Sequence, residues 1–223
     1  MTDHLPTAAG PWTRTGADRD APTRSERVPD NIVVVGAGLA GVSACERLRA
    51  LGYDGRLTLV GAEDQLPYDR PPLSKDVLLG RAAPEEVRLR PESWYATHDI
   101  ELRLGVVATE IRIDEGKVML SHGPPEPADA VLLATGGRPR RLTVPGGDHP
   151  AVTTLRTLSD AETLRERLDP GARVGVIGGG LIGAEVTSTA VTRGCDVTLL
   201  DPTSRPLTRA VGPEIAEILH AQH

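Results

Sequence analysis

The chain has 223 residues, of which 39% are hydrophobic and 25% charged, and this composition is typical of a folded globular protein. Its net charge of −6 gives no reason to expect nucleic acid as a partner, because nucleic-acid-binding proteins carry basic surfaces. No apolar run approaches the ~18 residues of a membrane span, and the N-terminus lacks the apolar core of a secretory signal, so we expect a cytoplasmic protein with no membrane partner.

The two cysteines, Cys45 and Cys195, agree with this expectation. Neither has the spacing of a metal-ligand set or of a Cys-x-x-Cys motif. A disulfide scaffold, a metal site and a redox dithiol are therefore not expected, and a reducing cytoplasm fits the sequence.

The chain begins with a polar segment, residues 1–29, that is rich in Thr, Pro, Arg, Asp and Ala and has no apolar periodicity. Such a segment buries too little apolar surface to fold, so we predict a disordered tail.

A β-α-β unit follows the tail. Ile32–Val35 is an apolar run that predicts a buried strand, Leu39 to about Leu51 predicts a helix, and Arg56–Val60 predicts a second strand. Between the first strand and the helix lies a glycine-rich turn, Gly36-Ala37-Gly38-Leu39-Ala40-Gly41. In such a turn the first glycine permits the bend, the second lets the backbone approach a pyrophosphate, and the third lets helix and strand pack closely.

The next part of the chain predicts irregular structure and then a small β-insertion. Prolines forbid regular structure in Leu66–Lys75 until about Ser74, and a short helix should follow. Val107–Ile113 and Lys117–Leu120 alternate around a turn signal and predict an antiparallel hairpin. Three further elements are expected here: a helix near Pro91–His98, a strand at Ile100–Leu104 and a buried strand at Ala130–Ala134.

The last part of the chain repeats the β-α-β pattern. A Pro/Gly-rich crossing at Pro139–Pro150 predicts a domain boundary. A helix is expected at Ser159–Leu168, with Ser159 as N-cap and Glu162 completing a capping box. The second unit runs from Arg173 to Leu200 around Gly178-Gly179-Gly180-Leu181-Ile182-Gly183, and a final helix begins near Pro213.

The acidic residues after the two units differ in placement. Asp201 directly follows the second strand of its unit, where a carboxylate accepts a ribose 2′-hydroxyl and repels a 2′-phosphate, so NADH is preferred over NADPH. Arg205 lies nearby and keeps NADPH open. In the first unit Gly61-Ala62 interrupts the expected position, and Glu63 or Asp64 must serve.

Two such turns in one chain imply two dinucleotides, the usual arrangement of a flavoprotein that takes hydride from a nicotinamide. Either motif alone could also be a glycine turn that only packs a helix on a strand. We therefore expect an α/β fold with two Rossmann-like units, FAD-binding at residues 30–145 and NAD(P)-binding at residues 146–223, and an antiparallel β-meander inserted in the first.

Four segments resemble the FAD-dependent NAD(P)H:ferredoxin reductases, a family of the pyridine nucleotide-disulfide oxidoreductase type that serves haem monooxygenases and ring dioxygenases. The segments are Pro67–Lys75, Leu133–Arg140, Leu155–Leu158 and Gly178–Glu185, and the resemblance covers about residues 30–223.

The resemblance implies a set of cofactor contacts. The FAD pyrophosphate would lie on Gly36, Gly38, Gly41 and the backbone of Ala40, and its adenosine ribose would lie near Glu63. The backbone of Ala108 would line the adenine site, and Thr135 and Gly136 would lie close to the ribityl-pyrophosphate region. Lys75 and Arg156 would make further contacts with FAD. For the nicotinamide dinucleotide the contacts are Gly178, Gly179, Gly180, Ile182, Gly183, Glu185 and Asp201.

The resemblance also implies the chemistry. Lys75 lies near the flavin ring and pairs with Glu185, which makes these two the expected catalytic residues; as bare sequence they could equally be solvated charges. Electrons pass from NADH to FAD and then singly to a [2Fe-2S] ferredoxin or similar carrier, with no protein thiol on the route. The resemblance further implies a longer protein, so the second unit is expected to be truncated. The alternative is a truncated, non-catalytic dinucleotide-binding or interaction module, and the sequence predicts no oligomeric state.

Overall fold

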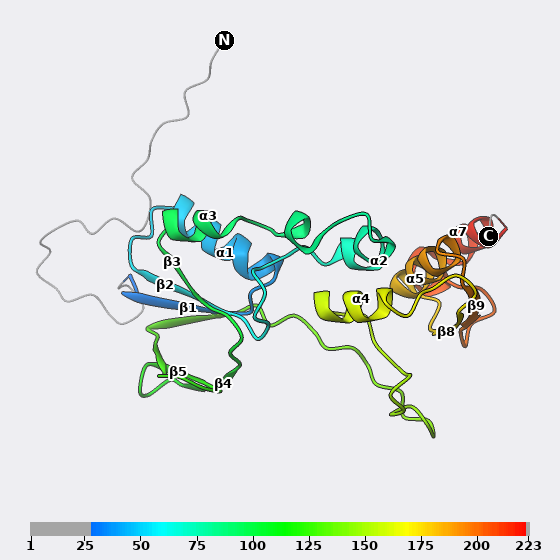
Figure 1. Ribbon diagram of the computed structural model, residues 1–223. Helices are drawn as coiled ribbons and strands as arrows, with labels where there is room; N and C mark the ends of the chain where they lie inside the picture. The colour runs from blue at the N-terminus through cyan, green and yellow to red at the C-terminus, as the bar shows by residue number, and fades with distance from the viewer. Residues whose placement is uncertain (1–27, 222–223) are drawn as a thin grey trace, which may run out of the picture. The chain divides into compact units, whose positions relative to one another are not determined.

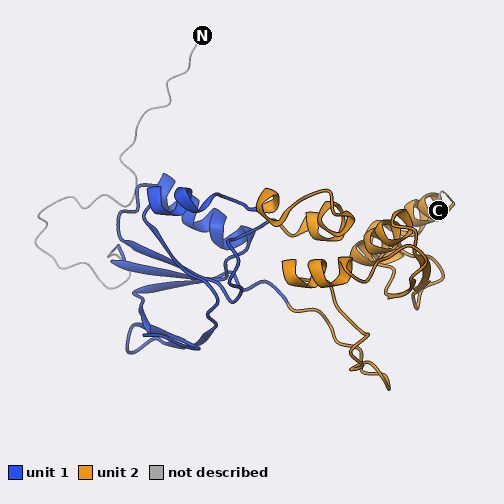
Figure 2. Cartoon of the chain, in the orientation of Figure 1, with its two compact units in different colours: residues 1–68, 88–137 blue, residues 69–87, 138–223 orange. Residues whose placement is uncertain are grey.

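The computed structural model describes residues 28–221, so the predicted tail lies outside the described residues except for its last two positions. The chain divides into two compact units (Figures 1 and 2). The first contains residues up to Tyr68 and Arg88–Gly137, and the second contains Asp69–Val87 and the chain from Arg138 onward. The segment Asp69–Val87 is thus counted with the second unit, whereas the expected domain ranges place it in the first.

The first unit is built on a parallel sheet in the order β3-β2-β1-β7. Its strands are β1 Asn31–Val35, β2 Arg56–Val60, β3 Ile100–Arg103 and β7 Ala130–Leu133. The chain leaves β1 in one direction to form β2 and β3 and returns on the other side of β1 as β7. This arrangement confirms the predicted α/β class.

The two faces of β1 pack against different layers. Ile32 and Val34 lie in a cluster with residues of the helices α1 (Leu39–Ala50) and α3 (Glu92–Thr97). Val33 and Val35, which alternate with them, pack against the antiparallel meander, whose strands are β4 Ala108–Arg112, β5 Lys117–Leu120 and β6 Glu126–Pro127. Figure 1 shows α1 and α3 on one side of the sheet and β4 and β5 on the other.

A buried carboxylate ties the meander to the sheet. The side chain of Glu126 is 2% exposed and accepts hydrogen bonds from Arg103 Nε at 2.6 Å and Arg56 Nη2 at 3.0 Å. Both arginines also pair with Glu101. The two-residue strand β6 was not predicted, because it is too short to leave a pattern; its place depends on this ion-pair cluster.

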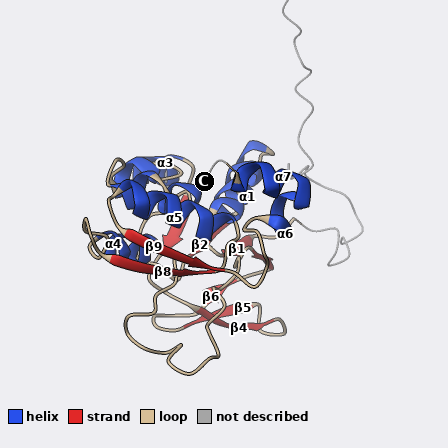
Figure 3. Cartoon of the chain, turned by 90° about the vertical axis from the view of Figure 1, so that its right-hand side faces the viewer, coloured by secondary structure: helices blue, strands red, loops and turns tan. Residues whose placement is uncertain are grey.

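The second unit centres on a parallel pair of strands, β8 Arg173–Ile177 and β9 Asp196–Leu200 (Figure 3). Its core contains Leu78, Leu168, Val186, Ala190 and Cys195. Leu78 is fully buried there, which explains why its segment belongs to this unit. The helices are η1 Pro71–Ser74, α2 Asp76–Leu79, η2 Pro84–Val87, α4 Leu158–Arg165, α5 Leu181–Thr192, α6 Thr208–Val211 and α7 Pro213–His220.

Two local predictions were wrong. Helix α4 is capped by Thr157 instead of Ser159: the Thr157 hydroxyl accepts the Asp160 N–H at 3.1 Å, and the Asp160 carboxylate accepts the Thr157 N–H at 2.9 Å. Regular structure also starts before Ser74, because Pro71 begins the 3-10 helix η1. A proline suits the first turn, where its missing N–H would have no helical partner.

Ile32–Val35 is buried as expected, whereas β7, β8 and β9 contain no buried residue. Leu133 at the end of β7 is 65% exposed, and Ile177 and Leu200 at the ends of β8 and β9 are 59% and 56% exposed. Each of these residues lies at the carboxyl end of its strand, and in β8 and β9 the partly buried Val174, Val176 and Val197 pack against the core of the second unit. Within residues 28–221, no helix is long and apolar enough to cross a membrane.

Candidate functional site

The turn after β1 needs two of its glycines for the packing of the protein itself. Gly36 has φ +118°, and a Cβ there would overlap the carbonyl of Ala134 at the end of β7. A Cβ on Gly41 would overlap the carbonyl oxygen of Gly36. These two positions therefore set the bend and the close approach of α1 to the sheet.

The middle glycine of the same turn has a different reason to be glycine. Gly38 is the N-cap of α1, its φ is −92°, and a Cβ there would meet no atom of the described residues within 4 Å. Neither strain nor packing excludes a side chain, and no side-chain cap satisfies the helix end. The first N–H groups of a helix have no intrahelical partners, and they form an anion site when nothing covers them. The empty space beside Gly38 is what a phosphate approaching this helix end requires.

The second unit repeats this design. Gly178 has φ +105°, and a Cβ on Gly183 would overlap the carbonyl oxygen of Gly178. Gly180 is the N-cap of α5, with φ −76° and nothing within 4 Å of an added Cβ. The two helices α1 and α5 each have 12 residues, so both carry a full helix dipole at this end.

In the first unit the glycine turn lies at the point where the strand order reverses. β7 and β2 flank β1 on opposite sides, and ligands of open α/β sheets bind outside the carboxyl ends of strands at such a point. Thr135 and Gly136 follow β7 there, and both are exposed. Gly136 has φ +67°, a left-handed conformation that glycine adopts readily.

The end of β2 explains why the expected acid is missing. A Cβ on Gly61 would lie 2.7 Å from the Cβ of Ala37, so the glycine turn itself excludes a side chain at that position. Glu63, two residues later, accepts a hydrogen bond from the Tyr68 hydroxyl at 2.5 Å. Ala108 begins β4 and packs against the valine cluster beneath the sheet.

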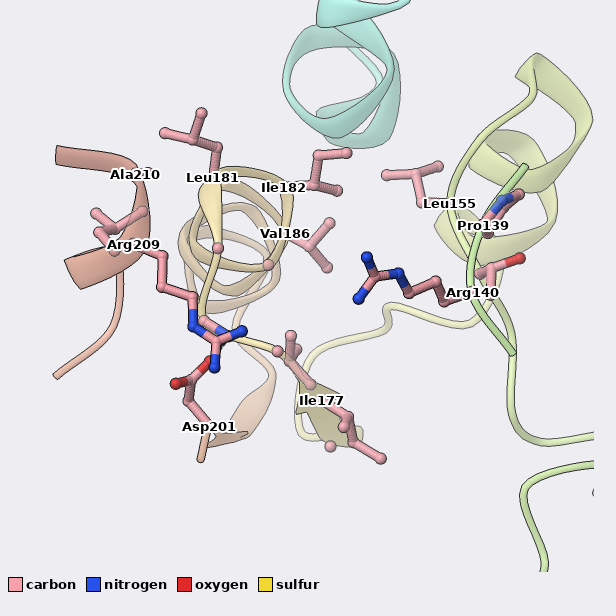
Figure 4. Close-up of a pocket in the computed structure, with 18 of the residues that line it drawn as sticks. Pro139, Arg140, Leu155, Ile177, Leu181, Ile182, Val186, Asp201, Arg209 and Ala210 are labelled. Atoms are coloured by element: carbon pink, nitrogen blue, oxygen red, sulfur yellow. Dashed lines mark hydrogen bonds between the residues drawn. The ribbon is translucent and has the colours of Figure 1, made fainter. Parts of the chain in front are cut away.

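The second unit has a pocket of about 980 Å³ over the turn that follows β8 (Figure 4). Its walls include residues 178–183, Asp201, Arg209 and Arg140. Figure 4 shows the guanidinium of Arg209 directed toward the Asp201 carboxylate, and Arg140 extending into the pocket from another wall. The pocket therefore combines a glycine-rich helix end with one carboxylate and two cations.

Hydrogen bonds hold the Asp201 carboxylate in one orientation. Oδ2 accepts the Gly179 N–H at 2.6 Å, and Oδ1 accepts the Thr203 N–H at 2.8 Å and the Thr203 hydroxyl. The Thr203 hydroxyl, followed by the two backbone N–H groups, lowers the pKa of Asp201 below its usual range, so the group is ionised at neutral pH.

A second, smaller pocket of about 270 Å³ in the same unit brings together Lys75 and Glu185, which the sequence places 110 residues apart. Lys75 Nζ donates to Glu185 Oε1 at 2.9 Å, and Ser74 Oγ donates to Glu185 Oε2 at 2.5 Å. Partial burial raises the pKa of Glu185, but the bonds from Ser74 and Lys75 outweigh burial and lower it. The carboxylate is therefore ionised and bound through both oxygens.

Other groups complete this pocket. Thr189 Oγ1 donates to the Ser74 carbonyl at 2.8 Å in a buried hydrogen bond that ties η1 to α5. Arg156 and Arg70 also line the pocket, as does Ile182. The Nε of Arg156 is buried and has no hydrogen-bond partner among the described residues. Three cations, one carboxylate and an unused buried donor suit an anionic ligand.

Several of these residues were not found from the sequence. Ser74 and Thr189 act through contacts that span 111 and 115 residues, which no local pattern reveals. Arg209 lies on α6, a short helix that was not predicted. The contact of Thr203 with Asp201 could have been predicted from the sequence, because a hydroxyl two residues after an aspartate is a common local hydrogen-bond partner.

Thiol chemistry has no support in the described residues. Burial raises the pKa of the Cys45 thiol to about 12, and neither Cys45 nor Cys195 lines either pocket described above. Among residues 28–221 there is also no group of three or more His, Cys, Asp or Glu side chains that could hold a metal ion.

Comparisons with known proteins agree with this geometry. The family described as pyridine nucleotide-disulphide oxidoreductase matches residues 30–223. The chain is 41% identical over 186 residues to the benzene 1,2-dioxygenase system ferredoxin–NAD(+) reductase subunit of Pseudomonas putida, covering 83% of this chain and 45% of that protein. It is 40% identical over 191 residues to a rubredoxin–NAD(+) reductase of Pseudomonas putida, covering 86% and 50%.

A solved structure gives the same result. The covalent putidaredoxin reductase–putidaredoxin complex shares 44% sequence identity and a TM-score of 0.80 with this chain, over 86% of this chain and 48% of that one. The chain spans about half the length of the curated relatives it matches.

Proposed function

Because the chain belongs to the pyridine nucleotide-disulphide oxidoreductase family, we propose that its first unit binds FAD, that its second unit binds NADH, and that it works in a reductase of iron-sulfur electron carriers. The named relatives reduce a ferredoxin or a rubredoxin, and one similar structure is a complex with putidaredoxin. For this chain the carrier we propose is a [2Fe-2S] ferredoxin or a similar protein. We place the reaction in the cytoplasm, where free cysteines such as Cys45 and Cys195 stay reduced.

The observation that carries the proposal is a pair of glycines at two helix N-caps. Gly38 and Gly180 cap two 12-residue helices at equivalent turns, and among residues 28–221 nothing lies within 4 Å of a Cβ added at either one. A glycine that neither strain nor packing requires is explained when a ligand approaches the backbone. Two such positions fit two pyrophosphates.

In the first unit, we assign the FAD pyrophosphate to the N–H groups at the start of α1, around Gly38, Ala40 and Gly41. Glu63 is the ribose partner, and its bond from Tyr68 fixes the carboxylate. The remaining assigned contacts, from Gly36, Ala108, Thr135 and Gly136, come from the resemblance. When bound, FAD supplies the capacity to accept a hydride and to release electrons one at a time.

In the second unit, we assign the dinucleotide pyrophosphate to the turn formed by residues 178–183. The ionised Asp201 is the acceptor for a ribose 2′-hydroxyl, and its charge disfavours a 2′-phosphate, which supports NADH over NADPH. The smaller pocket carries the assignments made from the resemblance: Lys75 and Arg156 to FAD, and Ile182 and Glu185 to the nicotinamide dinucleotide. The Lys75 ammonium donates to Glu185, whose carboxylate also accepts from Ser74, and to the Pro71 carbonyl. These bonds hold the ammonium in place, so its charge is available to an electron-rich ligand.

Reciprocal variants test the assignment of one dinucleotide to each unit. Gly38→Val should weaken FAD binding at least tenfold and leave the affinity for ADP-ribose unchanged, because its methyl groups occupy the pyrophosphate position in the first unit only. Gly180→Val should do the reverse. Each variant places the same side chain at a helix N-cap, so each controls for the ~1 kcal/mol loss of helix capping in the other. FAD retention and ADP-ribose titration are the readouts, and wild-type FAD binding by Gly38→Val would refute the assignment.

One structural fact favours a second candidate function, a non-catalytic binding or interaction module. The large apolar side chains Ile177 and Leu200 are more than half exposed at the carboxyl ends of β8 and β9. Such residues often mark an interaction surface. The two candidates differ in whether NADH reduces FAD that is bound to this chain.

A further inference from the structure

The large pocket in the second unit is lined by an arginine that has no partner among the described residues. Arg140 is exposed and extends into the pocket from the side lined by residues 139–140 and 153–155 (Figure 4). Within residues 28–221 its guanidinium forms neither a hydrogen bond nor an ion pair. Its donors are therefore available to a ligand in the pocket.

Arg140 also gives this pocket its excess of positive charge. The other charged side chains that line the pocket are Asp201 and Arg209, whose charges are opposite. The Asp201 carboxylate is ionised and accepts the Gly179 N–H at 2.6 Å, so a negative charge lies directly beside the glycine turn. Residues 178–183, which form that turn, contain no charged side chain.

The turn by itself compensates little of the charge of a pyrophosphate. The N-terminus of α5 supplies N–H donors and a partial positive charge of about +0.5. Both phosphates of a dinucleotide are negatively charged, and Asp201 adds a further negative charge at the same turn. A guanidinium suits this deficit, because its planar fork donates parallel hydrogen bonds to phosphate oxygens.

The segment that carries Arg140 has no helix or strand. Residues 138–157, here called the connector, lie between the end of β7 and the start of α4 and contain only turns and irregular structure. Two stretches of the connector, residues 139–140 and 153–154, line the pocket. A ligand held between Arg140 and the start of α5 would therefore restrain the connector as well.

We propose that Arg140 is a phosphate-binding residue of the dinucleotide site, and that its contact with the ligand holds the connector against the pocket. This inference rests on the proposed binding of a nicotinamide dinucleotide in the second unit. It adds a side-chain cation to a pyrophosphate site that otherwise consists of backbone N–H groups. It also predicts that ligand binding slows the local opening of the connector.

Calorimetric titration with ADP-ribose tests the first part, because this probe carries the pyrophosphate and needs neither FAD nor turnover. Arg140→Gln should lower the affinity about tenfold, as expected for the loss of a charge-assisted hydrogen bond. Arg140→Lys should recover part of the loss, since it restores the charge but not the fork.

Two neighbouring arginines provide matched controls. Arg138 and Arg141 are exposed residues of the same connector, and neither lines the large pocket. Arg138→Gln and Arg141→Gln remove the same charge as Arg140→Gln, so they report any effect of net charge alone. Both variants should bind ADP-ribose like the wild type.

Amide hydrogen exchange tests the second part. At a saturating concentration of ADP-ribose, exchange in the wild type should slow both in the connector and in residues 178–183. In Arg140→Gln, saturated in the same way, it should slow only in residues 178–183.

Each result has a defined meaning. The inference is wrong, and the proposed function stands, if Arg140→Gln binds ADP-ribose like the wild type or if the two controls lose as much affinity as Arg140→Gln. Equal protection of the connector in Arg140→Gln and in the wild type would also overturn it. If the wild type does not bind ADP-ribose, the nicotinamide half of the proposed function fails and the inference fails with it.

Discussion

Replacing Glu185 by Gln removes one charge from the small pocket with little change in shape. The carboxylate accepts from Lys75 and Ser74, both in the segment that packs on α5. Without the charge, this segment should open more readily from α5 at neutral pH. We therefore expect faster amide hydrogen exchange in residues 69–87 and in the first turns of α5, with no change in the first unit.

The magnitude follows from the geometry of the ion pair. At 2.9 Å, opposite unit charges attract by about 1.4 kcal/mol at the dielectric constant of water and by about 6 kcal/mol at an effective value of about 20. The Lys75 side chain is 46% exposed and that of Glu185 33%, so solvent screening and side-chain ordering reduce the net gain to about 1 kcal/mol. This corresponds to about a fivefold change in the opening equilibrium.

The lowered pKa of Glu185 determines how the stabilisation from its ion pair changes with pH. The folded-state pKa of Glu185 lies below its ordinary value of 4.5, so the stabilisation is fully present above 4.5 and is lost as the pH falls through the folded-state value. Exchange in the variant should thus be about fivefold faster than in the wild type at pH 7, and the ratio of the two rates should fall toward one as the pH is lowered below 4.5 through the folded-state pKa. Because each ratio is taken at one pH, the intrinsic exchange rate cancels.

A matched control lies in the first unit. Glu46 pairs with Arg90 at 2.9 Å, with side chains 45% and 39% exposed, so Glu46→Gln removes a similar pair from α1. It should leave exchange in α5 unchanged. The reasoning is refuted if Glu185→Gln exchanges like the wild type at pH 7, or if its acceleration does not decrease as the pH is lowered below 4.5.

Three further predictions concern the packing that supports the sites. Glu126→Gln should lower the free energy of unfolding of the first unit by about 2 kcal/mol. The loss is smaller than for a fully buried ion pair because the arginine partners of Glu126 are 38% exposed. Denaturation followed by tryptophan fluorescence measures this loss, and an unchanged midpoint would contradict the prediction. Thr189→Val removes the buried hydrogen bond to the Ser74 carbonyl and should accelerate amide hydrogen exchange in residues 69–87 by roughly fivefold. This acceleration should be the same at every pH, whereas that of Glu185→Gln should depend on pH. A pH-dependent acceleration in Thr189→Val would contradict this explanation. Cys45, whose burial raises its pKa to about 12, should resist a thiol reagent at pH 8 in the folded chain and react once denaturant is added; rapid labelling of Cys45 in the native chain would show that the thiol is accessible.

The parts of the fold that follow local rules were predictable from the sequence. The structure has β1, α1 and β2 within one residue of the expected ranges, because an apolar run, a glycine turn and a glycine stop are signals contained in a few adjacent residues. The hairpin of β4 and β5 was found in the same way from alternation around a turn. The family was recognised because its motifs are also local.

What the sequence could not supply depends on contacts between distant residues. The segment 69–87 packs on α5 through Leu78. In addition, the Ser74 hydroxyl donates to Glu185 and the Ser74 carbonyl accepts from Thr189. These partners on α5 lie more than 100 positions away in the sequence. The cap of α4 was misplaced because serine is by itself a better N-cap than threonine, whereas the reciprocal bonds with Asp160 favour Thr157. Arg209 was overlooked because nothing in its neighbours marks α6 as a wall of the pocket.

The most direct test of the account is a visible absorption spectrum of the purified chain with FAD, recorded before and after anaerobic addition of NADH. The account predicts that the chain retains FAD and that NADH bleaches the flavin bands, which requires both dinucleotides to bind to this chain. A chain that retains FAD but is never bleached by NADH or NADPH, or one that cannot be loaded with FAD at all, would contradict it.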